Sequence, residues 1–140
     1  NIEKKISLAM AAMQDHDLVY IHIKGTDICG HDHQAAEKKE FIERIDRAFS
    51  TIDITDKIIA ISADHSTDTT TGFHSGDPVP SLIYSAHGRY DKCRAYSEQE
   101  CLYGGLGHLS SSSFLLTILD QMGRVHNFKK EDTDYISLFT

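Results

Sequence analysis

Apolar residues recur at helical spacing in three stretches of the chain. Such a stripe on one face is typical of an amphipathic helix, so we predict helices over residues 2–13, 34–49 and from about 110–113 to 122. Asp32 is the expected N-cap of the second helix, and the serine run Ser110–Ser113 supplies N-caps for the third. The apolar faces are Ile2, Ile6, Ala9, Met10 and Met13 in the first; Phe41, Ile42, Ile45, Ala48 and Phe49 in the second; and Leu115, Ile118, Leu119 and Met122 in the third.

Short apolar runs between these helices predict strands. Residues 18–23 and 58–61 are apolar or β-branched at nearly every position, which is typical of strands buried on both faces. A shorter strand is expected over residues 82–84, after Pro78-Val79-Pro80, and an edge strand over residues 93–96.

The order strand, loop, helix, strand is that of a βαβ unit, which predicts an α/β fold with a mostly parallel sheet flanked by helices. Ligands of such sheets bind beyond the carboxyl ends of the strands. The polar loops 26–33 and 63–80 each follow one of the two buried strands, so we expect both at the same edge of the sheet. We assign residues 1–126 to one domain and residues 127–140 to a C-terminal tail.

Composition narrows the class of protein. The chain has 140 residues, of which 40% are hydrophobic and 25% charged, as in a soluble globular domain. Its formal net charge is -7 and it has no Lys/Arg run, which argues against nucleic acid as a partner. Its apolar runs are too short to span a membrane, and we see no signal peptide. The three cysteines have no paired spacing, which indicates free thiols in a reducing cytosol.

Histidine is the unusual residue, with nine in the chain, and several lie beside aspartates in the two polar loops. Asp27 and His31 are four residues apart in the first loop. Asp64 and His65 directly follow the second predicted strand, and His74 comes later in the same loop. Each pair alone also fits a surface ion pair or an Asx turn. Their expected meeting at one sheet edge favours a metal site.

The chemistry of these ligands restricts the metal. Mixed carboxylate and imidazole ligation suits Mn or Zn, less often Fe or Mg, and argues against Ca, which takes oxygen ligands. Five candidate ligands are more than one tetrahedral site needs. Two adjacent cations would fit a two-metal phosphoryl-transfer centre.

These same residues carry a resemblance to a known family. The segments Thr26–Asp32, Asp64–Thr67, His74–Pro80 and Gly104–Gly107 resemble the C-terminal half of archaeal-type, 2,3-bisphosphoglycerate-independent (cofactor-independent) phosphoglycerate mutases, which belong to the alkaline phosphatase superfamily. The resemblance extends over residues 20–123, most of the chain. It implies part of an alkaline-phosphatase-like core.

The resemblance also implies a ligand set and a reaction. Asp27, His31 and His74 would hold one divalent metal, and Asp64 and His65 the other, with manganese expected first and zinc or magnesium as alternatives. An Asp and a Ser nucleophile from the N-terminal part of such enzymes would complete the second site. These cytoplasmic, glycolytic enzymes interconvert 2- and 3-phosphoglycerate through a phosphoserine intermediate.

We find no nucleophile-bearing turn ahead of Tyr20, so we assign no catalytic residue in this chain. We expect the chain to be the C-terminal metal-binding portion of a longer enzyme, inactive without the N-terminal portion. One alternative is another metal-dependent phosphatase, phosphonate enzyme or sugar-phosphate enzyme of the same superfamily. Another is a non-catalytic metal-binding module that folds alone.

Overall fold

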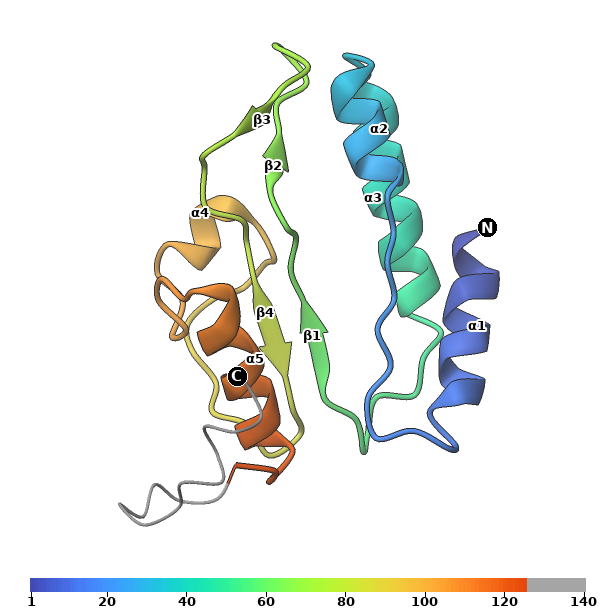
Figure 1. Cartoon of the computed structure of the whole chain (residues 1–140), viewed down its shortest axis with the longest axis vertical. Helices are drawn as coiled ribbons and strands as arrows, with labels where there is room; N and C mark the ends of the chain where they lie inside the picture. The colour runs from blue at the N-terminus through green and yellow to red at the C-terminus, as the bar shows by residue number, and fades with distance from the viewer. Residues whose placement is uncertain (126–140) are drawn as a thin grey trace. The chain divides into compact units, whose positions relative to one another are not determined.

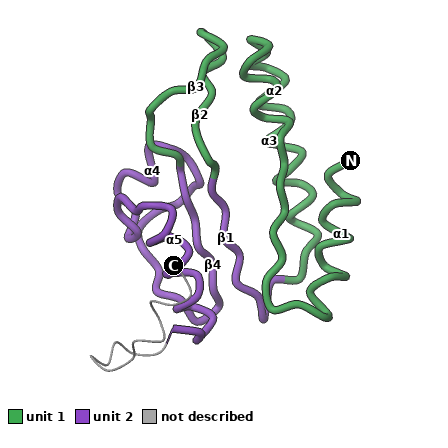
Figure 2. Tube along the Cα trace, in the orientation of Figure 1, with its two compact units in different colours: residues 1–53, 63–79 green, residues 54–62, 80–140 purple. Residues whose placement is uncertain are grey.

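The computed structural model of the chain describes residues 1–125. They divide into two compact units: unit 1 contains residues 1–53 and 63–79, and unit 2 contains residues 54–62 and 80–125 (Figure 2). The elements in chain order are α1 (Ile2–Ala12), α2 (Gly25–His31), α3 (Ala35–Phe49), β1 (Ile59–Ile61), β2 (Ser66–Thr67), β3 (His74–Ser75), β4 (Leu82–Tyr84), α4 (Glu98–Cys101) and α5 (Ser111–Gln121) (Figure 1).

The first predicted helix is confirmed as α1. The side-chain oxygen of Asn1 accepts a hydrogen bond from the backbone N–H of Lys4 at 3.0 Å and so caps the helix. Ile2 and Ile6, one turn apart on the same face, are each only 4% exposed. They form the core of unit 1 together with Ala48 of α3. The partly buried side chains around this core are Met10, Ile21, Ile23, Phe41, Ile45, Phe49 and Ile52.

The second predicted helix is confirmed as α3, but its predicted cap is wrong. Asp32 is the C-cap residue of α2, and Gln34 takes the N-cap position of α3 without a side-chain hydrogen bond. The reason is that an unexpected helix, α2, ends directly before α3 and uses Asp32 to finish its own last turn. The two helices pack against each other.

Helix α2 lies where we predicted a polar loop. Its sequence has too few apolar residues to show a helical stripe, and its packing on α3 replaces that missing local signal. Asp27 lies in its first turn and His31 in its last, the ends at which the helix dipole favours negative and positive charge respectively. The helix thus places both residues on a rigid backbone.

The strand predicted over residues 18–23 does not form. A strand needs a hydrogen-bonded neighbouring strand, and neither sheet of the described chain includes this segment. Its burial alternates instead: Ile21 and Ile23 pack against the core of unit 1, whereas Leu18 and Tyr20 are 51% and 82% exposed. The segment therefore connects α1 to α2 with one face packed.

The predicted parallel sheet is wrong. The described residues form two antiparallel pairs, β1 with β4 in unit 2 and β2 with β3 in unit 1. Strands β1 and β4 lie at the predicted positions, with Ile59 opposite Tyr84 and Ile61 opposite Leu82, but Ala60 between them is exposed. Ile83, which stands opposite Ala60 on the same face, is half-buried, so this face is only partly covered, as antiparallel sheets allow. The parallel arrangement rested on residues 18–23, which supply no strand.

Unit 2 differs from the prediction in one further place. Residues 93–96 are irregular, and the short helix α4 follows them. Asp91 fixes this region, because its carboxylate accepts the backbone N–H groups of Gly105 at 2.8 Å and Cys93 at 2.9 Å. Hydrogen bonds to the Asp91 side chain therefore hold this region in place of the predicted edge strand.

Helix α5 confirms the third predicted helix. Ser110 caps it by accepting the backbone N–H of Ser113 at 3.2 Å. All three cysteines are free and half-buried. No helix in the described part of the chain combines the length and apolar character needed to cross a membrane. The predicted tail, residues 127–140, and the boundary at residue 126 lie outside the described residues.

Candidate metal centre

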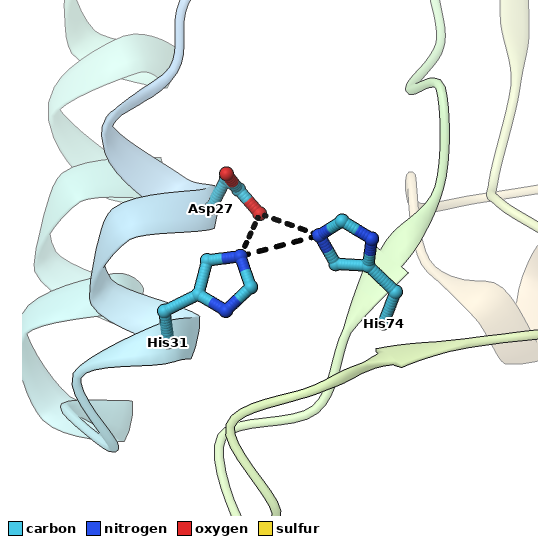
Figure 3. Close-up of side chains that lie close together, drawn as sticks. All are labelled: Asp27, His31 and His74. Carbon is cyan, nitrogen blue, oxygen red and sulfur yellow. Dashed lines mark hydrogen bonds and ion pairs between the residues drawn. The ribbon is translucent and has the colours of Figure 1, made fainter.

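Three side chains of unit 1 converge on one point (Figure 3). Asp27 and His31 come from α2, and His74 comes from β3. The His31 Nε2 atom lies 3.3 Å from Asp27 Oδ1 and 3.2 Å from His74 Nε2, and His74 Nε2 lies 3.7 Å from Asp27 Oδ1. Within residues 1–125 this is the one group of three or more such ligands whose donor atoms lie within 4.8 Å of one another.

The spacing of these atoms fits a shared divalent ion. Donor atoms bound at ~2.1 Å in tetrahedral geometry lie about 3.4 Å from one another. The three measured separations, 3.2, 3.3 and 3.7 Å, bracket that value. One carboxylate oxygen and two imidazole nitrogens form a donor set that suits Zn or Mn. The residues present therefore fit a metal with at least one further coordination position.

Helix geometry places two of the three ligands. Asp27 and His31 are separated by four residues, so their side chains share one face of α2. His74 reaches them from the hairpin of β2 and β3, where it stands opposite Thr67. Three of the predicted ligands, Asp27, His31 and His74, lie together, but the elements that carry them are a helix and a hairpin.

The carbonyl oxygen of Gly72 selects the tautomer of a neutral His31 ring. The Nδ1 atom of His31 lies 2.8 Å from the carbonyl oxygen of Gly72. A carbonyl oxygen only accepts hydrogen bonds, so Nδ1 carries the hydrogen and Nε2 of a neutral ring keeps its lone pair. That lone pair is directed toward Asp27 and His74, as a metal ligand requires. Gly72 has a φ of +72°, a conformation that glycine adopts without strain.

Asp27 is held in its charged form. The hydroxyl of Thr67 donates to Asp27 Oδ1 at 2.7 Å, and this bond is the main reason that the pKa of Asp27 lies below its ordinary value. Burial acts in the opposite direction, and the neighbouring His31, His65 and Lys24 lower the pKa further. The carboxylate is therefore ready to bind a cation without first losing a proton.

Solvent reaches the centre. The Asp27 side chain is 21% exposed, while those of His31 and His74 are 43% and 51% exposed. An ion can therefore enter without an opening motion.

Hydrogen bonding alone accounts for only part of this cluster. The Nε2–H of a neutral His74 ring would donate to the Nε2 lone pair of His31. The Asp27 oxygen would still face the same His31 lone pair, and two acceptors do not attract each other.

Asp64 and His65, the predicted ligands of a second metal, lie next to this centre. The ring of His65 stacks on that of His74 with a centroid separation of 3.6 Å. The Nε2 atom of His65 lies 3.6 Å from Asp64 Oδ2, and the Asp64 side chain is 84% exposed. The structure thus brings the two histidines of the loop together, and it leaves Asp64 and His65 outside the three-ligand group.

Sequence reasoning gave no role to Thr67. It is 6% exposed and joins Asp27 through its hydroxyl. No local pattern indicated this contact, because the partner Asp27 lies 40 positions earlier in the sequence.

The fold and the ligand cluster define a metal-dependent class of protein. Residues 1–131 match the Metalloenzyme superfamily, and the chain belongs to it. Its relatives include the 2,3-bisphosphoglycerate-independent phosphoglycerate mutases of Methanosphaerula palustris, 41% identical over 91% of this chain and 31% of the relative, and of Pyrococcus furiosus, 40% identical over 89% and 31%. The predicted resemblance to this archaeal group is confirmed.

A solved structure supports the same relationship. The PH0037 protein from Pyrococcus horikoshii is 37% identical, with a TM-score of 0.86, over 92% of this chain and 35% of that chain. The chain spans about a third of the length of the curated relatives it matches.

Proposed function

We propose that this chain forms the metal-binding part of a phosphoglycerate mutase that interconverts 2- and 3-phosphoglycerate. The observation that carries the proposal is the triangle of Asp27, His31 and His74 donor atoms, with separations that fit one divalent cation. The names of the archaeal relatives supply the substrate class. Manganese is the proposed metal, with zinc and magnesium as alternatives, and the proposed compartment is the cytoplasm.

Two metal positions follow from this proposal. Asp27, His31 and His74 hold the first ion, and Asp64 and His65 contribute to the second. Divalent cations at such a centre would neutralise the charge of a phosphoryl group. The residues of this chain orient the ligands: Gly72 fixes the tautomer of His31, and Thr67 keeps Asp27 charged.

No residue of this chain is proposed as the nucleophile. In the proposed enzyme a serine outside these 140 residues takes the phosphoryl group from one hydroxyl and returns it to the other. The chain on its own should therefore bind metal without turning over phosphoglycerate. Turnover of 3-phosphoglycerate by the purified 140-residue chain with Mn²⁺ at an ordinary enzymatic rate would show that the nucleophile assignment is wrong.

Calorimetric titration of the chain with Mn²⁺ and with Zn²⁺ tests the metal site directly. His31→Ala removes one of three ligands and should weaken binding at the first position by at least tenfold. His22→Ala is the matched control, because His22 is an exposed histidine of unit 1 outside the centre. Equal metal affinity in the wild-type chain and the His31→Ala variant would refute the proposed ligand set.

Metal stoichiometry tests the second position. This chain supplies only Asp64 and His65 to the second position, so that position should fill only at high metal concentration. Elemental analysis at saturating Mn²⁺ should then give two ions per chain, and His65→Ala should reduce the number toward one. An unchanged content of two ions in the His65→Ala variant would show that His65 is not a ligand of the second position. That result would not affect the ligand set proposed for the first position.

A further inference from the structure

Thr67 is the one buried polar residue in the described part of the chain, with 6% of its surface exposed. Buried hydroxyl groups need hydrogen-bond partners. The Oγ1 atom of Thr67 donates its single hydrogen to Asp27 Oδ1 at 2.7 Å and lies 3.4 Å from His65 Nδ1. Its hydroxyl therefore faces residues from both proposed metal positions.

The backbone of Thr67 is fixed independently of this hydroxyl. Its carbonyl oxygen accepts a hydrogen bond from Lys38 Nζ of α3 at 2.7 Å. Within the hairpin, Thr67 stands directly opposite His74, so the two side chains lie on the same face of the β2–β3 pair. Thr67 thus joins α2, α3 and β3 at one position.

Gly30 allows this close approach. A Cβ atom added at Gly30 of α2 would lie 2.8 Å from Thr67 Cγ2 and 3.0 Å from Thr67 Cβ. No residue with a side chain fits there without a shift of its neighbours. Helix α2 and strand β2 therefore meet with Thr67 packed directly on the helix, one turn from Asp27.

From these contacts we infer that Thr67 is a positioning residue for the proposed metal site: its hydroxyl sets the carboxylate of Asp27 at the distance from His31 and His74 that a shared cation needs. A carboxylate oxygen accepts more than one interaction, so Oδ1 of Asp27 keeps a lone pair for the ion while it accepts the Thr67 hydrogen. The inference rests on the proposed function, because it assumes that the three ligands bind metal. It assigns no direct contact between Thr67 and the ion.

A pair of variants separates positioning from packing. Thr67→Val keeps the shape of the side chain and removes the hydroxyl, whereas Thr67→Ser keeps the hydroxyl and removes a methyl group. If Thr67 only fills space against Gly30, the Ser variant should be the more damaged. If it positions Asp27, the Val variant should lose metal affinity and the Ser variant should retain it.

The experiment is a calorimetric titration of the 140-residue chain with Mn²⁺, together with the visible absorption of bound Co²⁺, which reports coordination geometry. Thr67→Val should lower affinity roughly 10–100-fold and change the Co²⁺ spectrum, as loss of a ligand's hydrogen-bond partner does elsewhere. Thr67→Ser should stay within about threefold of the wild-type chain, well below that range. Wild-type affinity and spectrum in the Val variant would overturn the inference, as would equal losses in Val and Ser.

Two further controls complete the test. If circular dichroism shows that Thr67→Val does not fold, Thr67→Ser and Thr67→Ala replace it, since both lack the methyl group and differ only in the hydroxyl. Ser should then bind Mn²⁺ at least tenfold more tightly than Ala, and equal affinity would overturn the inference. A wild-type chain that binds neither Mn²⁺ nor Co²⁺ would refute the proposed metal site itself. Metal binding that is unchanged by the Thr67 variants would instead refute only the role of Thr67.

Discussion

The Nδ1 atom of His31 lies 2.8 Å from the carbonyl oxygen of Gly72, and this contact determines which nitrogen of the ring is free to bind a metal. The contact predicts a single neutral tautomer for His31, with hydrogen on Nδ1 and none on Nε2. Two-dimensional ¹⁵N–¹H spectra that correlate the ring nitrogens and carbon-bound hydrogens distinguish the two tautomers. Addition of Zn²⁺ should shift the Nε2 resonance most, and hydrogen on Nε2 in the metal-free neutral ring would contradict the prediction.

Substitution of Gly30 tests how closely α2 must approach the hairpin. Gly30→Ala places a methyl group 2.8 Å from Thr67 Cγ2, and overpacking of this kind costs about 1–3 kcal/mol. That cost exceeds the gain of about 0.5–1 kcal/mol expected from alanine within a helix. We expect reduced stability in urea unfolding and weaker metal binding.

The matched control for this substitution is Gly76→Ala. A Cβ atom at Gly76 meets no other atom within 4 Å, and its φ is not positive. This variant should unfold within about 0.5 kcal/mol of the wild-type chain. A Gly30→Ala variant as stable as Gly76→Ala would mean that the helix and Thr67 separate at little cost.

The core of unit 1 predicts a contrast between two residues of α1. Ile6 is 4% exposed, whereas Leu8 on the same helix is 60% exposed. Ile6→Ala should lower the free energy of unfolding by about 2–4 kcal/mol, because it leaves a cavity against Ala48. Leu8→Ala should change it by less than about 1 kcal/mol. Denaturant titration followed by circular dichroism measures both, and similar losses would show that α1 is packed differently.

Tyr96 makes the stability of unit 2 depend on pH in the alkaline range. Its hydroxyl donates to the carbonyl oxygen of Pro80 at 2.8 Å, and burial raises the pKa of Tyr96 to about 12. Since the folded pKa exceeds the ordinary value of about 10, the folded state favours the neutral ring. Its contribution to stability is complete below about pH 10 and is lost as the pH rises to about 12.

Phenolate absorbance during alkaline titration measures this pKa. The difference between the wild-type chain and Tyr96→Phe isolates one tyrosine of the six in the chain. The step that disappears in the variant should lie near pH 12. Tyr96 is 43% exposed overall, so the raised pKa requires that its hydroxyl be shielded; a missing step at the ordinary pKa of about 10 would show that it is not.

The helices that the sequence predicted correctly are those with a continuous apolar stripe. Ile2, Ile6 and Ala9 mark α1 in this way, and they are buried in the structure. Helix α2 has no such stripe, and it forms through packing on α3, which a local pattern does not contain. The sequence therefore indicated Asp27 and His31 as partners from their spacing, while the helical backbone that joins them was missed.

The sheet was predicted less well, because strand pairing depends on residues far apart in the sequence. Apolar runs located β1 and β4 but not their antiparallel direction. The run at residues 18–23 has the composition of a buried strand. It does not form one, because no strand of the described chain pairs with it, and its composition could not reveal this. Three of the five predicted ligands, Asp27, His31 and His74, nevertheless lie close together, because His74 reaches α2 through the hairpin and not through a common sheet edge.

The separation of His74 from His31 along the chain has a consequence for dynamics. Their Nε2 atoms are 3.2 Å apart although 43 residues separate them in the sequence, whereas Asp27 and His31 share one helix. A cation held by all three would bind only the folded arrangement, because the unfolded chain does not bring the three ligands together, and its binding would therefore stabilise the contact between α2 and the hairpin. Amide hydrogens of the β2–β3 hairpin should then exchange with solvent more slowly when the ion is bound.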